Sequence, residues 1–237
     1  MKTAVVLLAL FAVALCEQSV PIPPSVDGVL VGYPNATFQI DAFIDLMCSD
    51  CMADWDTMRS VSSDVIKYGV SFRFHVFPLP YHTWAFLFAQ GANWFITNTS
   101  PEDTLKYFDL AYKIQPNYYN SVVANLSANQ ITSNLIAAVA AEFPHLTQGQ
   151  LTTAFTDMDY NVAARTSWKL ACTLGMTGTP SFKANGVTID GADGFTYSDW
   201  ITFLKQYVSI PDAKELIIAN KFKTNKLPKF AKIRKTN

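Results

Sequence analysis

The sequence predicts an α/β protein in which a block of helices interrupts a β-sheet. Three observations lead to this prediction. Residues 37–77 have the pattern of a strand, a helix and a second strand, residues 84–174 are compatible with helix throughout, and strand patterns return at residues 181–189. The 237 residues suit one enlarged domain or one small domain with an insertion.

The first unit is a strand, a helix and a strand. Residues 37–47 are rich in β-branched and aromatic side chains, which favour a strand. Residues 49–67 place apolar side chains at helical spacing, and Gly69 follows as a helix-terminating residue. A second strand is expected from Val70 to Phe77, where prolines halt it. The two strands of such a unit usually lie parallel with a right-handed crossover.

The middle of the chain is expected to be an all-helical insertion, and the end returns to the sheet. Helix-compatible segments lie near residues 84–97, 101–113, 121–141 and 147–174. Short strands from Ser181 to Ala184 and from Val187 to Ile189 then flank Asn185-Gly186, a strong hairpin signal. An amphipathic helix from Tyr197 to Val208 closes the domain.

Residues 1–16 are typical of a cleaved secretory signal peptide. Lys2 gives a positive start, Ala4 to Leu15 form an apolar run, and the small residues Ala14 and Cys16 precede the cleavage point. The run is too short for a membrane-spanning helix, which needs about 20 residues. We therefore expect no transmembrane segment in the mature chain, and a location outside the cell or in the lumen of the secretory or endolysosomal pathway.

Two further features fit a secretory route. Asn35, Asn98 and Asn125 begin Asn-X-Ser/Thr sequons and are glycosylation candidates. The C-terminal Lys235-Thr236-Asn237 is not an ER-retention signal.

The charge balance argues against a nucleic-acid partner. The chain has 18 Lys and Arg against 19 Asp and Glu, whereas nucleic-acid binders carry a clear basic excess. This balance hides an asymmetry. Residues 213–237 hold eight basic residues and one acid, and residues 17–212 hold nine basic residues and 18 acids. We expect the basic tail to be solvated and disordered; docking on the acidic body or on an anionic surface are the alternatives.

Two closely spaced cysteines form the main candidate catalytic site of this chain. Cys48-Ser49-Asp50-Cys51 lies where a strand leads into a helix, and the helix N-terminus favours a thiolate over a thiol. A mixed disulfide at Cys48 can then be resolved by Cys51. A redox pair is favoured, and an inert disulfide or half of a zinc site are the alternatives. A second Cys pair or a closely spaced His pair is absent, so we expect no metal.

A second motif, Gly178-Thr179-Pro180-Ser181-Phe182, directly precedes the hairpin. Together with the Cys-X-X-Cys pair and the final helix, it makes residues 29–208 resemble the thioredoxin superfamily. The 129 residues from Cys51 to Pro180 are similar to the DsbA-like branch, in which a helical domain interrupts the fold. The resemblance implies that Pro180 is cis and packs against the cysteines. It also implies that the Thr179 backbone pairs with a substrate strand.

With this resemblance, the sequence divides into six parts. These are a signal peptide (1–16), an extended lead-in (17–28), the first half of the thioredoxin fold with the Cys-X-X-Cys pair (29–83), the helical insertion (84–174), the second half with the cis-Pro loop and the C-terminal helix (175–212), and the basic tail (213–237).

Three positions depart from the family pattern. Ser49-Asp50 stands where strongly oxidising members have Pro-His, and the negative charge of Asp50 disfavours the thiolate. Ala42 stands where relatives place a buried acid. Asp45 either replaces that acid through water or, as we favour, is a satisfied carboxylate of the surface or a loop. Cys172 is expected to be a buried core residue, since free cysteine is usually buried, and a third thiol that forms a regulatory or intermolecular disulfide is the alternative.

The histidines are weaker candidates. We expect His75 to belong to the core or the sheet surface, because it lies within the second strand. His82 follows a Pro-Leu-Pro turn and is a candidate to line a groove above the sulfurs. Phosphate-loop, serine-hydrolase and zincin motifs are absent from the sequence, so we expect no cofactor.

These observations predict a secretory-pathway thiol-disulfide oxidoreductase that acts on protein or peptide thiols and disulfides. We also expect an unidentified partner protein that recycles its redox pair. Cys48 is the expected nucleophile, Cys51 the resolving thiol, and Thr179-Pro180 the substrate-binding segment; Ser49, Asp50 and Asp45 modulate the pair. The alternative is an inert DsbA-like binding or structural module with a stable Cys48–Cys51 disulfide. Chemistry resembling that of glutathione-dependent relatives is disfavoured by secretion.

Overall fold

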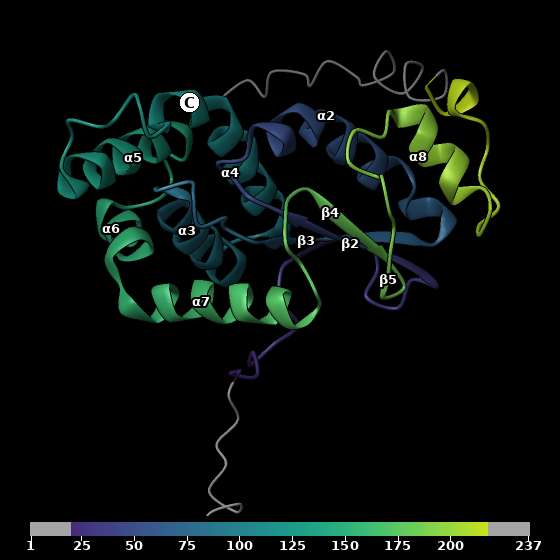
Figure 1. Ribbon diagram of the computed structural model, residues 1–237, viewed down its shortest axis with the longest axis horizontal. Coiled ribbons are helices and arrows are strands. Elements are labelled where there is room, and N and C mark those ends of the chain that lie inside the picture. Colours follow the sequence, from purple (N-terminus) through teal and green to yellow (C-terminus); the bar gives the residue numbers. More distant parts are fainter. Residues whose placement is uncertain (1–19, 218–237) are drawn as a thin grey trace, which may run out of the picture.

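The computed structural model describes residues 20–217. The predicted signal peptide and all but the first residues of the predicted basic tail lie outside this part. Five strands form one mixed sheet in the order β1-β3-β2-β4-β5 (Figure 1). The strands are β1 (Val29–Val31), β2 (Phe38–Ile44), β3 (Val70–Val76), β4 (Ser181–Ala184) and β5 (Val187–Thr188).

The predicted strand–helix–strand unit is confirmed. β2 and β3 are parallel, with Phe38 opposite Val70 and Ile44 opposite Val76. Between them lies α2 (Ser49–Asp64), followed by a single 3₁₀ turn, η1 (Ile66–Tyr68). Gly69 ends this turn with φ +79°, a left-handed conformation that glycine adopts at little cost.

The predicted hairpin is also confirmed. β4 and β5 pair antiparallel around Asn185 and Gly186, whose φ angles are +46° and +85°. Positive φ at both central residues is the requirement of a type I′ turn, for which Asn-Gly is the preferred pair. The final helix, α8 (Tyr197–Leu204), starts at the cap residue Thr196 and ends before the predicted Val208.

Helices fill the chain between β3 and β4. They are α3 (Ala85–Asn98), α4 (Pro101–Ile114), the 3₁₀ turn η2 (Gln115–Tyr118), α5 (Ala128–Glu142), α6 (Gln148–Thr156) and α7 (Met158–Thr173). The single segment expected at 147–174 is two helices, because the Asp157 side chain caps a new one by accepting from the Asp159 backbone N–H. The segment expected from residue 121 begins at Ala128, where Ser127 and Gln130 form a capping box.

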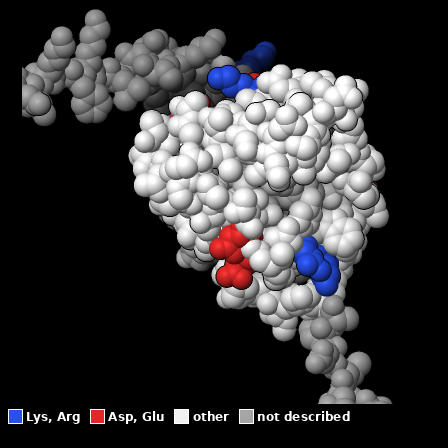
Figure 2. All heavy atoms as spheres, turned by 90° about the vertical axis from the view of Figure 1, so that its left-hand side faces the viewer, with Lys and Arg blue, Asp and Glu red and all other residues white. Residues whose placement is uncertain are grey.

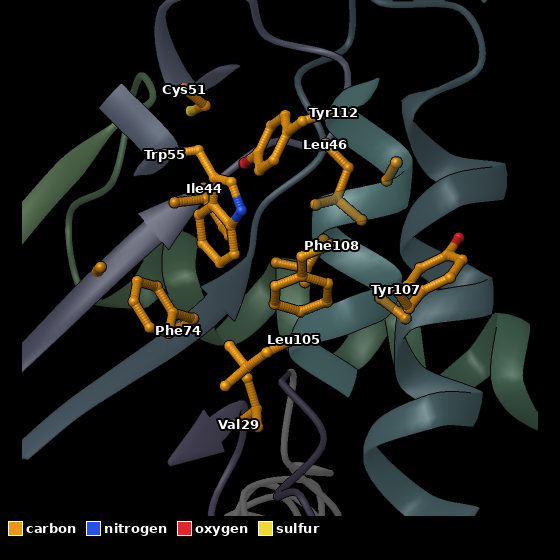
Figure 3. Close-up of a cluster of buried hydrophobic side chains, with 14 of the residues drawn as sticks. Val29, Ile44, Leu46, Cys51, Trp55, Phe74, Leu105, Tyr107, Phe108 and Tyr112 are labelled. Carbon is orange, nitrogen blue, oxygen red and sulfur yellow. The ribbon is translucent and has the colours of Figure 1, made fainter. Parts of the chain in front are cut away.

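Trp55 joins the sheet to the helical insertion. In Figure 1, α2 and α8 lie above the sheet and α7 lies below it. Figure 3 shows the indole of Trp55 between the strands and α4. Its ring centroid is 5.2 Å from that of Phe74 in β3, and 5.8 and 5.2 Å from those of Phe108 and Tyr112 in α4. The indole N–H donates to Asp109 of α4 at 2.6 Å. The buried indole therefore fixes the position of α4 relative to β3.

The part of the insertion that contains α5 and α6 presents a largely uncharged surface. Between Lys113 and Asp157 the only Asp, Glu, Lys or Arg is Glu142. Figure 2 shows the side on which α5 and α6 lie, and few charged side chains are visible on it. The acidic excess of the body is therefore carried mainly by the rest of the fold. Within residues 20–217, no helix is long and apolar enough to cross a membrane.

The close packing around Gly91 generates a stability prediction. A Cβ added at Gly91 of α3 would lie 2.4 Å from Phe155 Cε1 and 2.6 Å from Tyr107 Oη. We expect Gly91→Ala to lower the free energy of unfolding by about 1–3 kcal/mol, because overpacking outweighs the better helix propensity of alanine. Urea unfolding of the two proteins measures this difference.

Gly149→Ala in α6 is the matched control. A Cβ there meets only Thr147 Oγ1, at 3.9 Å. This change is expected to be neutral or to stabilise by up to about 1 kcal/mol. Equal losses of stability in both variants would contradict the close packing at Gly91.

Candidate active site

Cys48 and Cys51 lie at the start of α2, as predicted. Cys48 is the N-cap residue, and its backbone N–H donates to Asp45 O at 3.1 Å. Its carbonyl accepts from Met52 N at 3.1 Å and so begins the helix. Both side chains are buried, Cys51 completely, and both are free thiols. The Cys48 sulfur therefore sits where the N–H groups of the first helical turn are unpaired.

The Thr179-Pro180 segment meets this helix end. Its peptide bond is cis, as the family resemblance implied. Cys48 Sγ donates to Thr179 O across 3.4 Å, although 131 residues separate the two in the sequence. Within residues 20–217, the buried hydroxyl Oγ1 of Thr179 has no hydrogen-bond partner. This hydroxyl is thus available to donate to a sulfur that has lost its proton.

The two thiols have opposite electrostatic environments. The pKa of Cys48 is lowered to about 6, chiefly by a hydrogen bond from Cys51, against the opposing effect of burial. The Thr179 side chain and the backbone N–H groups of Cys51 and Asp50 contribute further. Burial, together with the nearby charge of Cys48, raises the pKa of Cys51. These shifts favour the thiolate form of Cys48 and the protonated form of Cys51.

Asp45 is a loop carboxylate with satisfied hydrogen bonds, as we favoured, but it is buried and does not lie at the surface. Its side chain is 0% exposed and accepts three hydrogen bonds. The donors are the Met47 backbone N–H (2.8 Å), the Leu79 backbone N–H (3.0 Å) and His82 Nδ1 (2.6 Å). Such bonds offset the cost of removing a carboxylate from water. The sequence could not show this, because Leu79 and His82 come from the loop after β3.

His82 is the partner that the sequence did not assign to Asp45. Its imidazole is part-exposed, and the hydrogen bond that it donates to Asp45 raises the pKa of His82. The charge of the Cys48 thiolate also raises that pKa, so the two groups attract each other. The Tyr81 ring packs edge-on against His82, with centroids 4.7 Å apart. The loop after β3 thus pairs the His82 imidazole with the buried Asp45 carboxylate, three residues before Cys48.

Other predicted residues lie away from this cluster or serve the core. Ala42 is buried in β2 opposite Phe74 and Phe182, so that position holds no acid. His75 is buried as expected, with Nδ1 2.7 Å from Asp27 and Nε2 3.0 Å from Asp41, and these carboxylates raise its pKa against the effect of burial.

Cys172 is exposed, so the expectation of a buried residue is wrong. The reason is helical phase, because α7 turns its neighbour Ala171 into the protein and Cys172 away from it.

The two residues between the cysteines and the three sequon asparagines are all exposed. Ser49 and Asp50 are exposed at the first turn of α2. Asn35, Asn98 and Asn125 are exposed as well. In the part of the chain that the structure describes, no group of three or more His, Cys, Asp and Glu side chains is arranged to hold a metal ion.

Residues 25–206 match the family model described as Thioredoxin. Because the match spans more than half of the chain, this chain belongs to the thioredoxin family. No curated protein matches the sequence.

Comparison with solved structures identifies proteins with a similar fold. The chain is similar to alpha-DsbA1 of Wolbachia pipientis, with a TM-score of 0.61 at 18% identity, covering 85% of this chain and 97% of that one. DsbA of Chlamydia trachomatis gives a TM-score of 0.61 at 13% identity, over 80% and 95%. BdbD of Bacillus subtilis gives 0.59 at 16% identity, over 80% and 98%. The predicted fold, a DsbA-like thioredoxin fold with a helical insertion, is confirmed.

The hydrogen bonds at Cys48 predict a pH profile. Alkylation of Cys48, followed by mass spectrometry of its peptide, is expected to rise with pH around a midpoint of about 6, its pKa. In Thr179→Val the hydroxyl donor is lost, and we expect the midpoint to rise by about one unit. Thr179→Ser keeps the hydroxyl and should keep the wild-type midpoint. A valine variant with an unshifted profile would show that the hydroxyl does not act on the thiolate.

Proposed function

We propose that this protein is a thiol-disulfide oxidoreductase that acts on protein or peptide substrates through Cys48 and Cys51. The observation that carries the proposal is the Cys48 sulfur, whose pKa is lowered to about 6 at the N-terminus of α2, in contact with the cis Thr179-Pro180 segment. A thiolate at neutral pH is the attacking species in disulfide exchange.

The reaction proceeds in two exchanges. The Cys48 thiolate attacks one sulfur of a substrate disulfide, which forms a mixed disulfide and releases the other substrate sulfur as a thiolate. Cys51 then loses its proton to that leaving thiolate and attacks the Cys48 sulfur. The protein is left with a Cys48–Cys51 disulfide and the substrate with two thiols. The reverse sequence oxidises a substrate dithiol.

The pKa of Cys48 bears on the direction of electron flow. Because folding lowers this pKa from 9.0 to about 6, the thiolate stabilises the folded reduced protein fully above pH 9.0, and this stabilisation is lost as pH falls from there through about 6. Thioredoxin, a reductant, has a corresponding pKa of about 7, and DsbA, a strong oxidant, of about 3.5. A value of about 6 supports a mild oxidant or a reductase- or isomerase-like enzyme.

The proposed setting is the secretory or endolysosomal lumen or the outside of the cell. The apolar N-terminal run and the three exposed sequons at Asn35, Asn98 and Asn125 support it. Catalysis requires a redox partner that returns Cys48 and Cys51 to their starting state. Thr179 presents the backbone edge at which a substrate strand would pair.

An insulin-reduction assay with dithiothreitol tests the activity. Cys48→Ser is expected to abolish the catalysed rate, because it removes the attacking sulfur. Cys51→Ser should accumulate the mixed disulfide. The control is Cys172→Ser, which removes an exposed thiol outside the pair and should keep the full rate. If the rate of insulin reduction is the same in Cys48→Ser as in the wild-type protein, the oxidoreductase proposal fails and the inert binding or structural module is the remaining alternative.

A redox titration in glutathione buffers separates the enzyme from that alternative. We expect a reversible Cys48–Cys51 couple between about −120 and −270 mV, the interval between DsbA and thioredoxin. Alkylation of reduced thiols and mass spectrometry measure it. A pair that stays oxidised below about −300 mV would be a structural disulfide.

A further inference from the structure

An apolar pocket lies between the loop after β3 and helix α7. Its volume is about 320 Å³, at the lower end of the range for pockets that bind small ligands. Leu79, Phe86, Trp168 and two loop prolines give it apolar walls. The Trp168 ring is stacked on Phe77, with centroids 6.1 Å apart and an angle of 17°. This stacking holds one wall of the pocket in place before any ligand arrives.

Two cations stand at this pocket without carboxylate partners. Arg165 and Lys169 are four residues apart on α7, so they lie on the same side of the helix, and both line the pocket. Within residues 20–217, neither Arg165 nor Lys169 has a carboxylate within 4.0 Å. Residues 17–212 contain only nine Lys and Arg against 18 Asp and Glu. Two unpaired cations beside an apolar surface complement a ligand that has both an apolar group and a negative charge.

The pocket is connected to the reactive cysteine through Asp45. Two of its lining residues, Leu79 and His82, hydrogen-bond to the Asp45 carboxylate. The carbonyl of Asp45 in turn accepts the Cys48 backbone N–H at 3.1 Å. The pocket contains neither Thr179 nor Pro180. A substrate segment held here would therefore use contacts separate from the strand-pairing edge at Thr179.

We propose that this pocket is a substrate-specificity subsite that takes an apolar side chain next to an Asp or Glu in the polypeptide substrate. The apolar side chain fills the space between Leu79, Phe86 and Trp168, and the carboxylate pairs with Arg165 and Lys169. The identity of the occupant as a substrate segment rests on the proposed function. The charge preference rests on the pocket itself.

Binding of cysteine-free peptides tests the subsite apart from redox chemistry. Two fluorescein-labelled peptides of equal length and apolar content, one with Phe-Asp and one with Phe-Lys at its centre, are titrated with residues 17–237 and followed by anisotropy. We expect the Phe-Asp peptide to bind roughly tenfold more tightly, and this preference to shrink as salt is raised. Arg165→Glu with Lys169→Glu is expected to abolish or invert it.

The matched control is Lys67→Glu with Lys113→Glu. Both lysines are exposed and neither lines the pocket, and the pair changes the net charge by the same amount. This variant should keep the preference. Trp168→Ala should weaken both peptides alike, because it removes an apolar wall and leaves the cations.

Two outcomes would overturn the subsite: equal affinity of wild-type protein for both peptides, or the same loss of preference in the control as in the Arg165 and Lys169 variant. The insulin assay answers a different question. If the charge preference is present and Cys48-dependent reduction is absent, the redox function fails, and the pocket remains a peptide-binding site that is not a substrate subsite.

Discussion

The site depends on the position of β2 at the centre of the sheet. This strand pairs in parallel with β3 on one side and antiparallel with β4 on the other. Its C-terminal end therefore receives three segments at once: the start of α2 with Cys48, the loop after β3 with His82, and the Thr179-Pro180 segment that leads into β4. A change in the register of either pairing would separate groups that now lie in hydrogen-bond contact, since one residue of slip reverses the faces of a strand.

Asp45 holds together the segments that meet at the end of β2. It is the first residue after β2, and its carboxylate joins backbone and side-chain donors from two segments that meet there. A buried carboxylate with three donors is a costly group to disturb, because losing one partner leaves charge without compensation. The same residue accepts from the Met47 N–H in the turn before Cys48 and from two residues of the pocket, Leu79 and His82, so one carboxylate joins that turn to the pocket.

The helical insertion has two sides with different roles. Trp55 and its aromatic neighbours fasten α4 to the sheet, as Figure 3 shows, and Gly91 permits the close packing of helices within the insertion. α7 carries Arg165 and Lys169 next to the active-site loop, whereas the face formed by α5 and α6 is nearly free of charge (Figure 2). The charged side chains that could select a partner on the insertion therefore lie at the α7 pocket and not on α5 and α6.

The sequence by itself determined the elements whose signals are local. Strand composition, the Asn185-Gly186 turn and the placement of Cys48 between strand and helix are properties of short segments. Only the tertiary structure decided the environment of Asp45, its pairing with His82, the exposure of Cys172 and the pocket at α7. These depend on which distant segments meet, and on the rotational phase of a helix about its axis, neither of which is encoded in residue type or spacing alone.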